Sequence, residues 1–298
     1  MTYSMVARDP ATGQLGVAVQ SHYFSVGSIV AWAEPGVGTV ATQSFAEPAY
    51  GPRGLALIRA GRSAAGALGE LIDADPGEAV RQVAIVDAAG RVAVHTGRRC
   101  IPEAGHRVGQ QVSAQANMMR RDTVWHAMIE AYEAAEGDLA LRLLAALDAA
   151  EAEGGDVRGR QSAAIVVVDG RRSDEPWRHR PVDLRVDDHP DPLPELRRLL
   201  ELRRAYDRVE RAEELALAGD LPGALAEYEQ ASEDVPDNTE FLFWRGVTLA
   251  GVGRVDEARD FLARAYAAND GWAELLRRLV DVGLIPDDPE LVGQLLPN

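Results

Sequence analysis

Apolar and polar side chains alternate from the second residue of the chain, a pattern that predicts a β-strand. One face of this strand carries the hydroxyls of Thr2 and Ser4, and the other face is apolar. Residues 9–13 (DPATG) predict a turn, because proline restricts φ and glycine accepts a positive φ. Residues 15–20 then return as a second strand. The chain is therefore expected to open with a β-hairpin.

The same periodicity divides residues 28–190 into blocks of strands and helices. Strands are predicted at 28–33, 37–43, 82–87, 91–96, 111–117 and 161–169, with an edge strand at 180–186. Helices are predicted at 55–60, at 64–74 with Ser63 as cap, after a cap at Asp122, and at 139–152. Along the chain, groups of strands therefore alternate with pairs of helices. Two sheets packed face to face, with a helix pair outside each, would bury every apolar face.

Beyond residue 190 the pattern becomes helical and repeats itself. Prolines at positions 190 and 192 are expected to block a helix, which predicts two domains, 1–190 and 191–298. A helix is predicted at 194–217. Five pairs of small residues recur 34 positions apart: Ala212/Gly246, Ala216/Ala250, Gly219/Gly253, Ala224/Ala258 and Ala231/Ala265. This period is typical of tetratricopeptide repeats, in which small residues let two helices pack closely.

Negative charge is concentrated in the second predicted domain. Of the net charge of −16, residues 183–298 contribute −13, and the chain has no basic footprint for nucleic acid. No apolar run approaches the length of a membrane-spanning helix, and the first residues lack the features of a secretory signal. A single cysteine, Cys100, excludes an intramolecular disulfide. These features predict a cytoplasmic protein that binds neither nucleic acid nor membrane.

Three segments of the first domain occur in a characteristic order: VARDPATGQLGVAVQS, GVGTVATQSFAEPAYGPRGL and GGDVRGRQSAA. They resemble the family catalogued as domain of unknown function 1028. The resemblance implies a fold like that of the N-terminal-nucleophile hydrolases, a four-layer αββα sandwich, and a chemistry of amide hydrolysis by an N-terminal Thr, Ser or Cys. The expected fold class is therefore an α+β sandwich followed by an all-α helical repeat domain.

Thr2 is the sharpest catalytic candidate. Removal of Met1 by an aminopeptidase would give Thr2 a free α-amine, which can take the hydroxyl proton while the oxygen attacks a carbonyl. All 31 basic residues are arginine, so no lysine can assist this step. The alternative is that Thr2 is only a good strand former. Asn117 and Asp156 complete the predicted catalytic set.

A glycine-rich loop at 154–162 (GGDVRGRQS) is the second candidate, because it brings backbone amides and polar side chains to the start of a strand. Its predicted substrate contacts are Arg158, Gln161 and Ser162, with Arg158 able to clamp a carboxylate. The alternative is a helix C-cap followed by a surface loop in which Asp156 and Arg158 pair with each other.

Two amides and one arginine complete the candidate binding residues. Gln43 and Asn117 lie at predicted strand ends and could donate hydrogen bonds to an oxyanion. Alternatively, they satisfy backbone groups. Arg53 lies beside a helix start, where an anion could rest, unless it is a solvated turn residue.

The preferred function is an amidohydrolase that cleaves a small molecule or short peptide by acyl transfer to Thr2. No cofactor is expected, and the six histidines lack metal-ligand spacing. The rival is a non-catalytic adaptor that binds a protein partner through its helical repeats. A weaker idea is cell-wall binding through the tail from Trp272, which resembles a segment described as peptidoglycan-binding. Self-association into a homo-oligomer is left open by the sequence.

Overall fold

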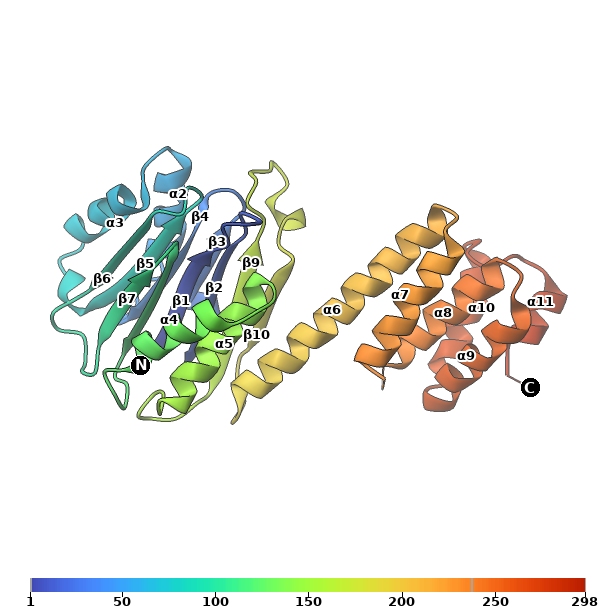
Figure 1. Cartoon of the computed structure of the whole chain (residues 1–298). Coiled ribbons are helices and arrows are strands. Elements are labelled where there is room, and N and C mark those ends of the chain that lie inside the picture. Colours follow the sequence, from blue (N-terminus) through green and yellow to red (C-terminus); the bar gives the residue numbers. More distant parts are fainter. Residues whose placement is uncertain (1, 237, 298) are drawn as a thin grey trace. The chain divides into compact units, whose positions relative to one another are not determined.

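The computed structural model describes residues 2–236 and 238–297, and the chain forms two compact units (Figure 1). The sheet-bearing unit extends to Leu199, and the helical unit begins at Leu200. The change falls within one helix, α6 (Pro192–Leu217), and not at residue 190. Pro192 and Pro194 lie in the first turn of α6, where proline is tolerated because the N–H groups have no intrahelical acceptor.

Six strands form one antiparallel sheet in the order β10-β9-β2-β1-β8-β7. Their bounds are β1 (Thr2–Arg8), β2 (Leu15–Ser21), β7 (Gly105–Gly109), β8 (Val112–Asn117), β9 (Ser162–Val168) and β10 (Val182–Val186). β1 and β2 form the predicted hairpin, with Ser4 opposite Val19. On its other side β1 pairs with β8, with Thr2 opposite Asn117. The start of β1 is therefore tied into the sheet on both edges.

Four further strands form a second antiparallel sheet in the order β3-β4-β5-β6. Their bounds are β3 (Ala31–Glu34), β4 (Gly38–Ser44), β5 (Arg81–Asp87) and β6 (Val92–Thr96). Side chains of the two sheets share one buried core, to which the six-stranded sheet gives Val6, Val17 and Val166 and the four-stranded sheet gives Ala41 and Val86. The two sheets therefore bury their facing sides against each other.

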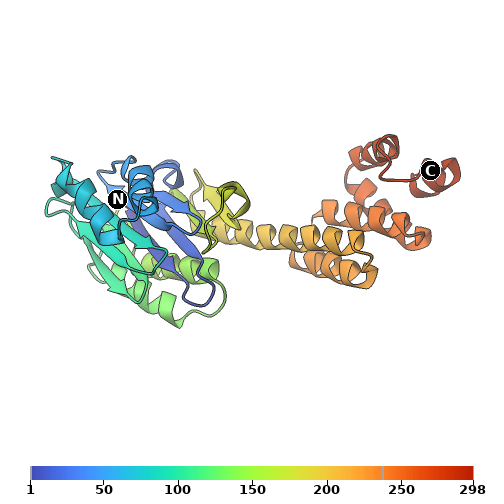
Figure 2. The same ribbon diagram turned by 90° about the horizontal axis from the view of Figure 1, so that it is seen from above.

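Helix pairs cover the outer sides of the sheets, as Figures 1 and 2 show. α2 (Tyr50–Arg59) and α3 (Ala64–Asp73) pack on the four-stranded sheet. α4 (Val124–Ala134) and α5 (Leu139–Ala152) pack on the six-stranded sheet, against strands that include β1, β2 and β8. The caps of α3 and α5 follow the usual chemistry, since Ser63 Oγ accepts from Gly66 N and Asp138 accepts from Leu141 N.

Part of the strand predicted at 28–33 is wrong, because residues 27–30 form a short helix, α1 (Gly27–Val30), before β3 begins. Val26 and Val30 both enter the core between the sheets, and their separation of four residues suits a helical turn. The sequence also did not predict β7. This strand lies at the edge of its sheet and contains two glycines.

The helix predicted at 55–60 begins earlier, at Tyr50. Gly51 lies against the ring of Trp32, where a Cβ atom would come within 2.2 Å, so glycine is needed inside the first turn. Pro52 is tolerated in that turn for the reason given for α6. The prediction that Asp122 caps the next helix is also wrong. The N-cap of α4 is Thr123, and its side chain makes no capping hydrogen bond.

In the helical unit, the described residues form the rest of α6 and five further helices. These are α7 (Leu221–Asp234), α8 (Thr239–Gly251), α9 (Val255–Ala268), α10 (Gly271–Asp281) and α11 (Pro289–Leu295). Most small residues of the 34-residue period lie where helices pack: a Cβ at Gly246 would come within 2.7 Å of Leu262, and Ala224, Ala258 and Ala265 are fully buried. Gly219 and Gly253 instead lie exposed in turns, with φ of 85° and 79°. Across the described helices of both units, none combines the length and apolar character needed to cross a bilayer.

Candidate functional site

Thr2 lies at the first position of β1, on the side that faces the second sheet. Only 6% of its surface is exposed, and its Oγ1 donates a hydrogen bond to Ser21 Oγ at 3.1 Å. Ser21 is the last residue of β2, and the antiparallel hairpin brings the end of β2 beside the start of β1. Met1, whose removal the catalytic hypothesis requires, lies outside the described residues.

A cavity of about 270 Å³ opens beside Thr2. Its polar lining comes from Thr2, Gln43 and Ser44, and its apolar lining from Tyr23, Val26, Ile29, Val30, Ala46 and Pro48. Ser44 has a φ of 71°, which is unusual for a residue other than glycine and ends β4 with a sharp change of direction. The residues that follow β4 thereby form one wall of the cavity.

Buried amides surround Thr2, and Gln82 fixes how they are oriented. Gln82 Nε2 donates to the carbonyls of Gly105 (3.1 Å) and Ala116 (2.9 Å), which can only accept. Gln82 Oε1 must therefore accept, and it does so from Gln43 Nε2 at 2.7 Å and from Asn117 Nδ2 at 3.0 Å. The network continues through Ser4, since Ser4 Oγ donates to Gln43 Oε1 at 2.6 Å.

The same two amides hold the backbone of Thr2. Gln43 Nε2 lies 3.3 Å and Asn117 Nδ2 3.4 Å from the Thr2 carbonyl oxygen, which accepts from both. Asn117 Oδ1 is buried and has no hydrogen-bond partner among the described residues. The structure thus brings together three predicted site residues, Thr2, Gln43 and Asn117.

Asp156 lies beside this group but faces the glycine-rich loop. Its carboxylate, fully buried, accepts from the backbone N of His22 (3.2 Å) and of Arg158 (2.9 Å), and it pairs with Arg158 Nη2 at 3.1 Å. Gly154 and Gly155, with φ of 105° and 53°, turn the chain from α5 into this loop. The Asp156–Arg158 pair is the arrangement expected of a self-contained loop, and it ties the loop to the end of β2.

Gln161 and Ser162 also make structural contacts. Gln161 Nε2 donates to Asp188 at 3.2 Å, on an exposed side of the unit. Ser162 Oγ is buried; it accepts from Val26 N at 3.0 Å and donates to the carbonyl of Tyr23. Because Tyr23 and Val26 line the cavity, Ser162 holds the segment that forms its second wall.

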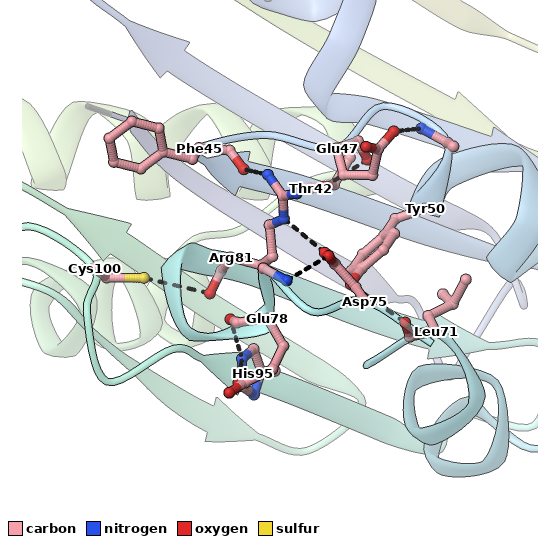
Figure 3. Close-up of polar contacts among 12 residues, drawn as sticks. Thr42, Phe45, Glu47, Tyr50, Leu71, Asp75, Glu78, Arg81, His95 and Cys100 are labelled. Carbon is pink, nitrogen blue, oxygen red and sulfur yellow. Dashed lines mark hydrogen bonds and ion pairs between the residues drawn. The ribbon is translucent and has the colours of Figure 1, made fainter. Parts of the chain in front are cut away.

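A partly buried ion pair between Arg81 and Asp75 supports the first wall (Figure 3). Arg81 Nη1 donates to the carbonyl of Phe45 at 2.6 Å, and Arg81 Nε pairs with Asp75 Oδ2 at 2.7 Å. The Tyr50 hydroxyl donates to the same carboxylate at 2.9 Å. The hydrogen bond from Arg81, more than any other contact, lowers the pKa of Asp75 to about 2. Asp75 is therefore ionised at neutral pH and keeps Arg81 against the loop.

Arg53 does not line the cavity beside Thr2. It lies exposed in the first part of α2 and lines a separate cavity of about 500 Å³ between α2 and α3, together with Glu47 and Glu70. Within residues 2–236 and 238–297, no group of three or more His, Cys, Asp or Glu side chains is placed to hold a metal ion.

Sequence reasoning missed Ser21, Gln82 and Gln115, which complete the polar network. Gln115 Nε2 donates to Ser4 Oγ at 2.6 Å. A signal was present, since each of these polar residues occupies a buried strand position, and Ser113, Gln115 and Asn117 recur on β8 with the period of two that places them on one face.

Comparison with known proteins identifies two regions. Residues 2–196 match the family of unknown function DUF1028, and residues 215–279 match a tetratricopeptide repeat. The crystal structure of protein SPO2555 from Silicibacter pomeroyi, assigned to DUF1028, is similar at 33% sequence identity and a TM-score of 0.60. The similarity covers 67% of this chain and 88% of that one. No curated protein matches the chain.

Proposed function

The chain belongs to the DUF1028 family of unknown function, and we propose that its sheet-bearing unit is an amide hydrolase with Thr2 as the nucleophile. One observation carries the proposal: the Thr2 hydroxyl lies at the start of a central strand, inside the sandwich and at the wall of a cavity. A threonine that served only as a strand former would not need a cavity beside its oxygen. The substrate is a small amide or a short peptide.

The arrangement of layers supports the same assignment. A helix pair covers the outer side of each of two stacked sheets, and we assign this arrangement to the four-layer αββα class of the N-terminal-nucleophile hydrolases. In that class the nucleophile is the first residue of the mature chain. The proposal therefore requires that the residue before Thr2 is removed.

The proposed reaction proceeds through an ester on Thr2. The free α-amine takes the proton of Oγ1 as this oxygen attacks the amide carbonyl of the substrate. The C–N bond then breaks, and the proton passes from the α-amine to the leaving amine. A water molecule, deprotonated by the α-amine, then attacks the ester carbonyl. The bond between the acyl carbon and Oγ1 breaks, the α-amine returns its proton to Oγ1, and the carboxylic acid is released. This sequence needs the neutral form of the α-amine, and the burial of Thr2 disfavours the charged form.

Gln43 and Asn117 are better suited to position Thr2 than to bind an oxyanion. Their amide N–H groups are already engaged by the Thr2 carbonyl and by Gln82. Asn117 Oδ1, which has no partner among the described residues, can accept an N–H bond from the α-amine and so direct its lone pair toward Oγ1. Asp156 acts indirectly. Its carboxylate accepts a hydrogen bond from the backbone N of His22, which follows Ser21, and Ser21 contacts Thr2.

Substitution of Thr2 tests the proposal with a panel of acyl anilides. We expect Thr2→Ala to lower kcat/KM by about 10³-fold or more, and Thr2→Ser to retain measurable activity because it keeps a hydroxyl beside the amine. Both variants should unfold close to the wild-type temperature, because the Thr2 side chain makes a single described hydrogen bond. Full activity in Thr2→Ala would remove Thr2 from the reaction.

A second candidate function belongs to the helical unit. Its match to a tetratricopeptide repeat favours an adaptor that binds a protein segment. This role needs no catalysis and does not exclude the first. An unmodified, unreactive Thr2 would leave the adaptor as the better account of the whole chain.

A further inference from the structure

We propose that the cavity beside Thr2 accepts the acyl side of the substrate, and that this acyl group is small, uncharged and apolar. The inference rests on the proposed hydrolysis at Thr2 and specifies its substrate class. It follows from the chemistry of the cavity wall, from the charges of the products and from the cavity volume.

Among the residues that the structure describes, those that line the cavity bring neither a carboxylate nor a guanidinium into its wall. Five aliphatic side chains and the ring of Tyr23 form most of it, and its polar groups are the Gln43 amide and the hydroxyls of Thr2, Ser44 and Tyr23. The arginines that the sequence suggested for carboxylate binding lie elsewhere, since Arg158 pairs with Asp156 and Arg53 lines a different cavity. A charged acyl chain would lose its water here without gaining a counter-ion, which is strongly unfavourable.

The charges of the products decide which side of the amide enters. The leaving amine becomes an ammonium ion at neutral pH, and the cavity wall offers it no acidic partner. The new carboxylate, in contrast, forms at the carbon bound to Thr2 Oγ1, at the Thr2 end of the cavity. The amine side of the substrate therefore lies toward the opening of the cavity. There the side chain of Tyr23, which is 53% exposed, can contact the leaving amine.

The volume limits the size of the acyl group. A cavity of about 270 Å³ equals the liquid volume of about nine water molecules at roughly 30 Å³ each. This space holds a branched aliphatic or single-ring acyl group but not a lipid chain. The side chains of Val26 and Val30 are buried in the core, so the cavity cannot widen without moving α1.

Two anilides of similar size test the inference with the same leaving group: isovaleryl p-nitroanilide, which is neutral, and succinyl p-nitroanilide, which carries a carboxylate. We expect kcat/KM to be at least about 100-fold higher for the isovaleryl compound. Ile29→Arg places a guanidinium in the cavity wall and should reduce this ratio by at least tenfold. Ile29→Met should keep the order of preference. Equal rates for the two anilides, or faster succinyl cleavage, would overturn the inference and leave the hydrolase intact.

Binding to full-length Thr2→Ala separates this inference from the proposed reaction. Isovaleramide should perturb the NMR signals of residues that line the cavity, and succinamate at the same concentration should not. Selective binding of isovaleramide without any hydrolysis by the wild type would support the cavity assignment and contradict the reaction. Binding of neither amide, or of succinamate alone, would contradict the cavity assignment.

Discussion

The two ends of the space between the sheets are built from different chemistry, although the same strands form both. At one end the facing side chains are aliphatic, among them Val6, Val17 and Val86. At the other end, a few residues along the same strands, they are hydroxyls and amides, among them Thr2 and Gln82. The apolar end needs no partner beyond good packing. The polar end is stable only while its hydrogen bonds are made.

This difference indicates what each end is for. Replacing a satisfied buried network by an apolar core is often neutral or stabilising, so stability alone does not require amides beside Thr2. A network in which each of these amide side chains has two or more partners fixes atoms to within a narrow range. Such fixing is what a reacting hydroxyl requires. We therefore interpret the polar end as the part of the fold that serves the site.

The largest expected effect in this comparison comes from Gln82→Met, which keeps the volume but removes the central amide. The carbonyls of Gly105 and Ala116 and the amides of Gln43 and Asn117 each lose a partner. We expect a loss of about 3–4 kcal/mol in the free energy of unfolding. Urea unfolding followed by the strand signal in circular dichroism measures it.

The matched variant at the apolar end is Val86→Ala. It removes two methyl groups from the shared core and should cost about 2 kcal/mol. Hydrolysis by the folded Val86→Ala protein should stay near that of the wild type, while folded Gln82→Met should lose most of it. If Gln82→Met were the less destabilising of the two, the network would not hold the polar end together.

A smaller effect on the free energy of unfolding is expected at low pH, where protonation of Asp75 weakens the ion pair that supports the cavity wall. Because the pKa of Asp75 is lowered from 3.8 to about 2, its ion pair with Arg81 contributes fully above about pH 4. The contribution falls as the pH drops from about 4 to 2, since the unfolded chain binds the proton first. The total is at most about 2 kcal/mol.

Arg81→Met isolates this contribution. The difference in unfolding free energy between the wild type and Arg81→Met should be largest at pH 5 and should shrink toward pH 2. A difference that stayed constant over this range would show that the pair does not stabilise the wall through its charge.

Most helices and strands of the fold could be predicted from local sequence patterns. The opening hairpin, α5 with its Asp138 cap, and the 34-residue period each depend on residues close together in sequence or on a regular spacing. The predicted strand at 28–33 failed because Val26 and Val30 are placed by contacts from the opposite sheet. Periodicity alone does not contain that information.

The candidate site was only partly predictable for the same reason. Thr2 was identified because removal of Met1 would give it a free α-amine, and Gln43 and Asn117 by their place at strand ends. That Gln82 joins them depends on the packing of two sheets, which no single segment encodes. Whether Arg158 binds a substrate carboxylate or pairs with Asp156 likewise depends on the turn that brings these two side chains together.

The most direct test of the central claim is the chemistry of the first residue. The purified protein would be incubated with p-nitrophenyl isovalerate and its N-terminal peptide analysed by mass spectrometry. We predict that, after an acid quench, the N-terminal peptide begins at Thr2 and carries one isovaleryl group on the Thr2 side chain, which Thr2→Ala does not acquire. A chain that retains Met1, or a Thr2 peptide that stays unmodified, would contradict the account.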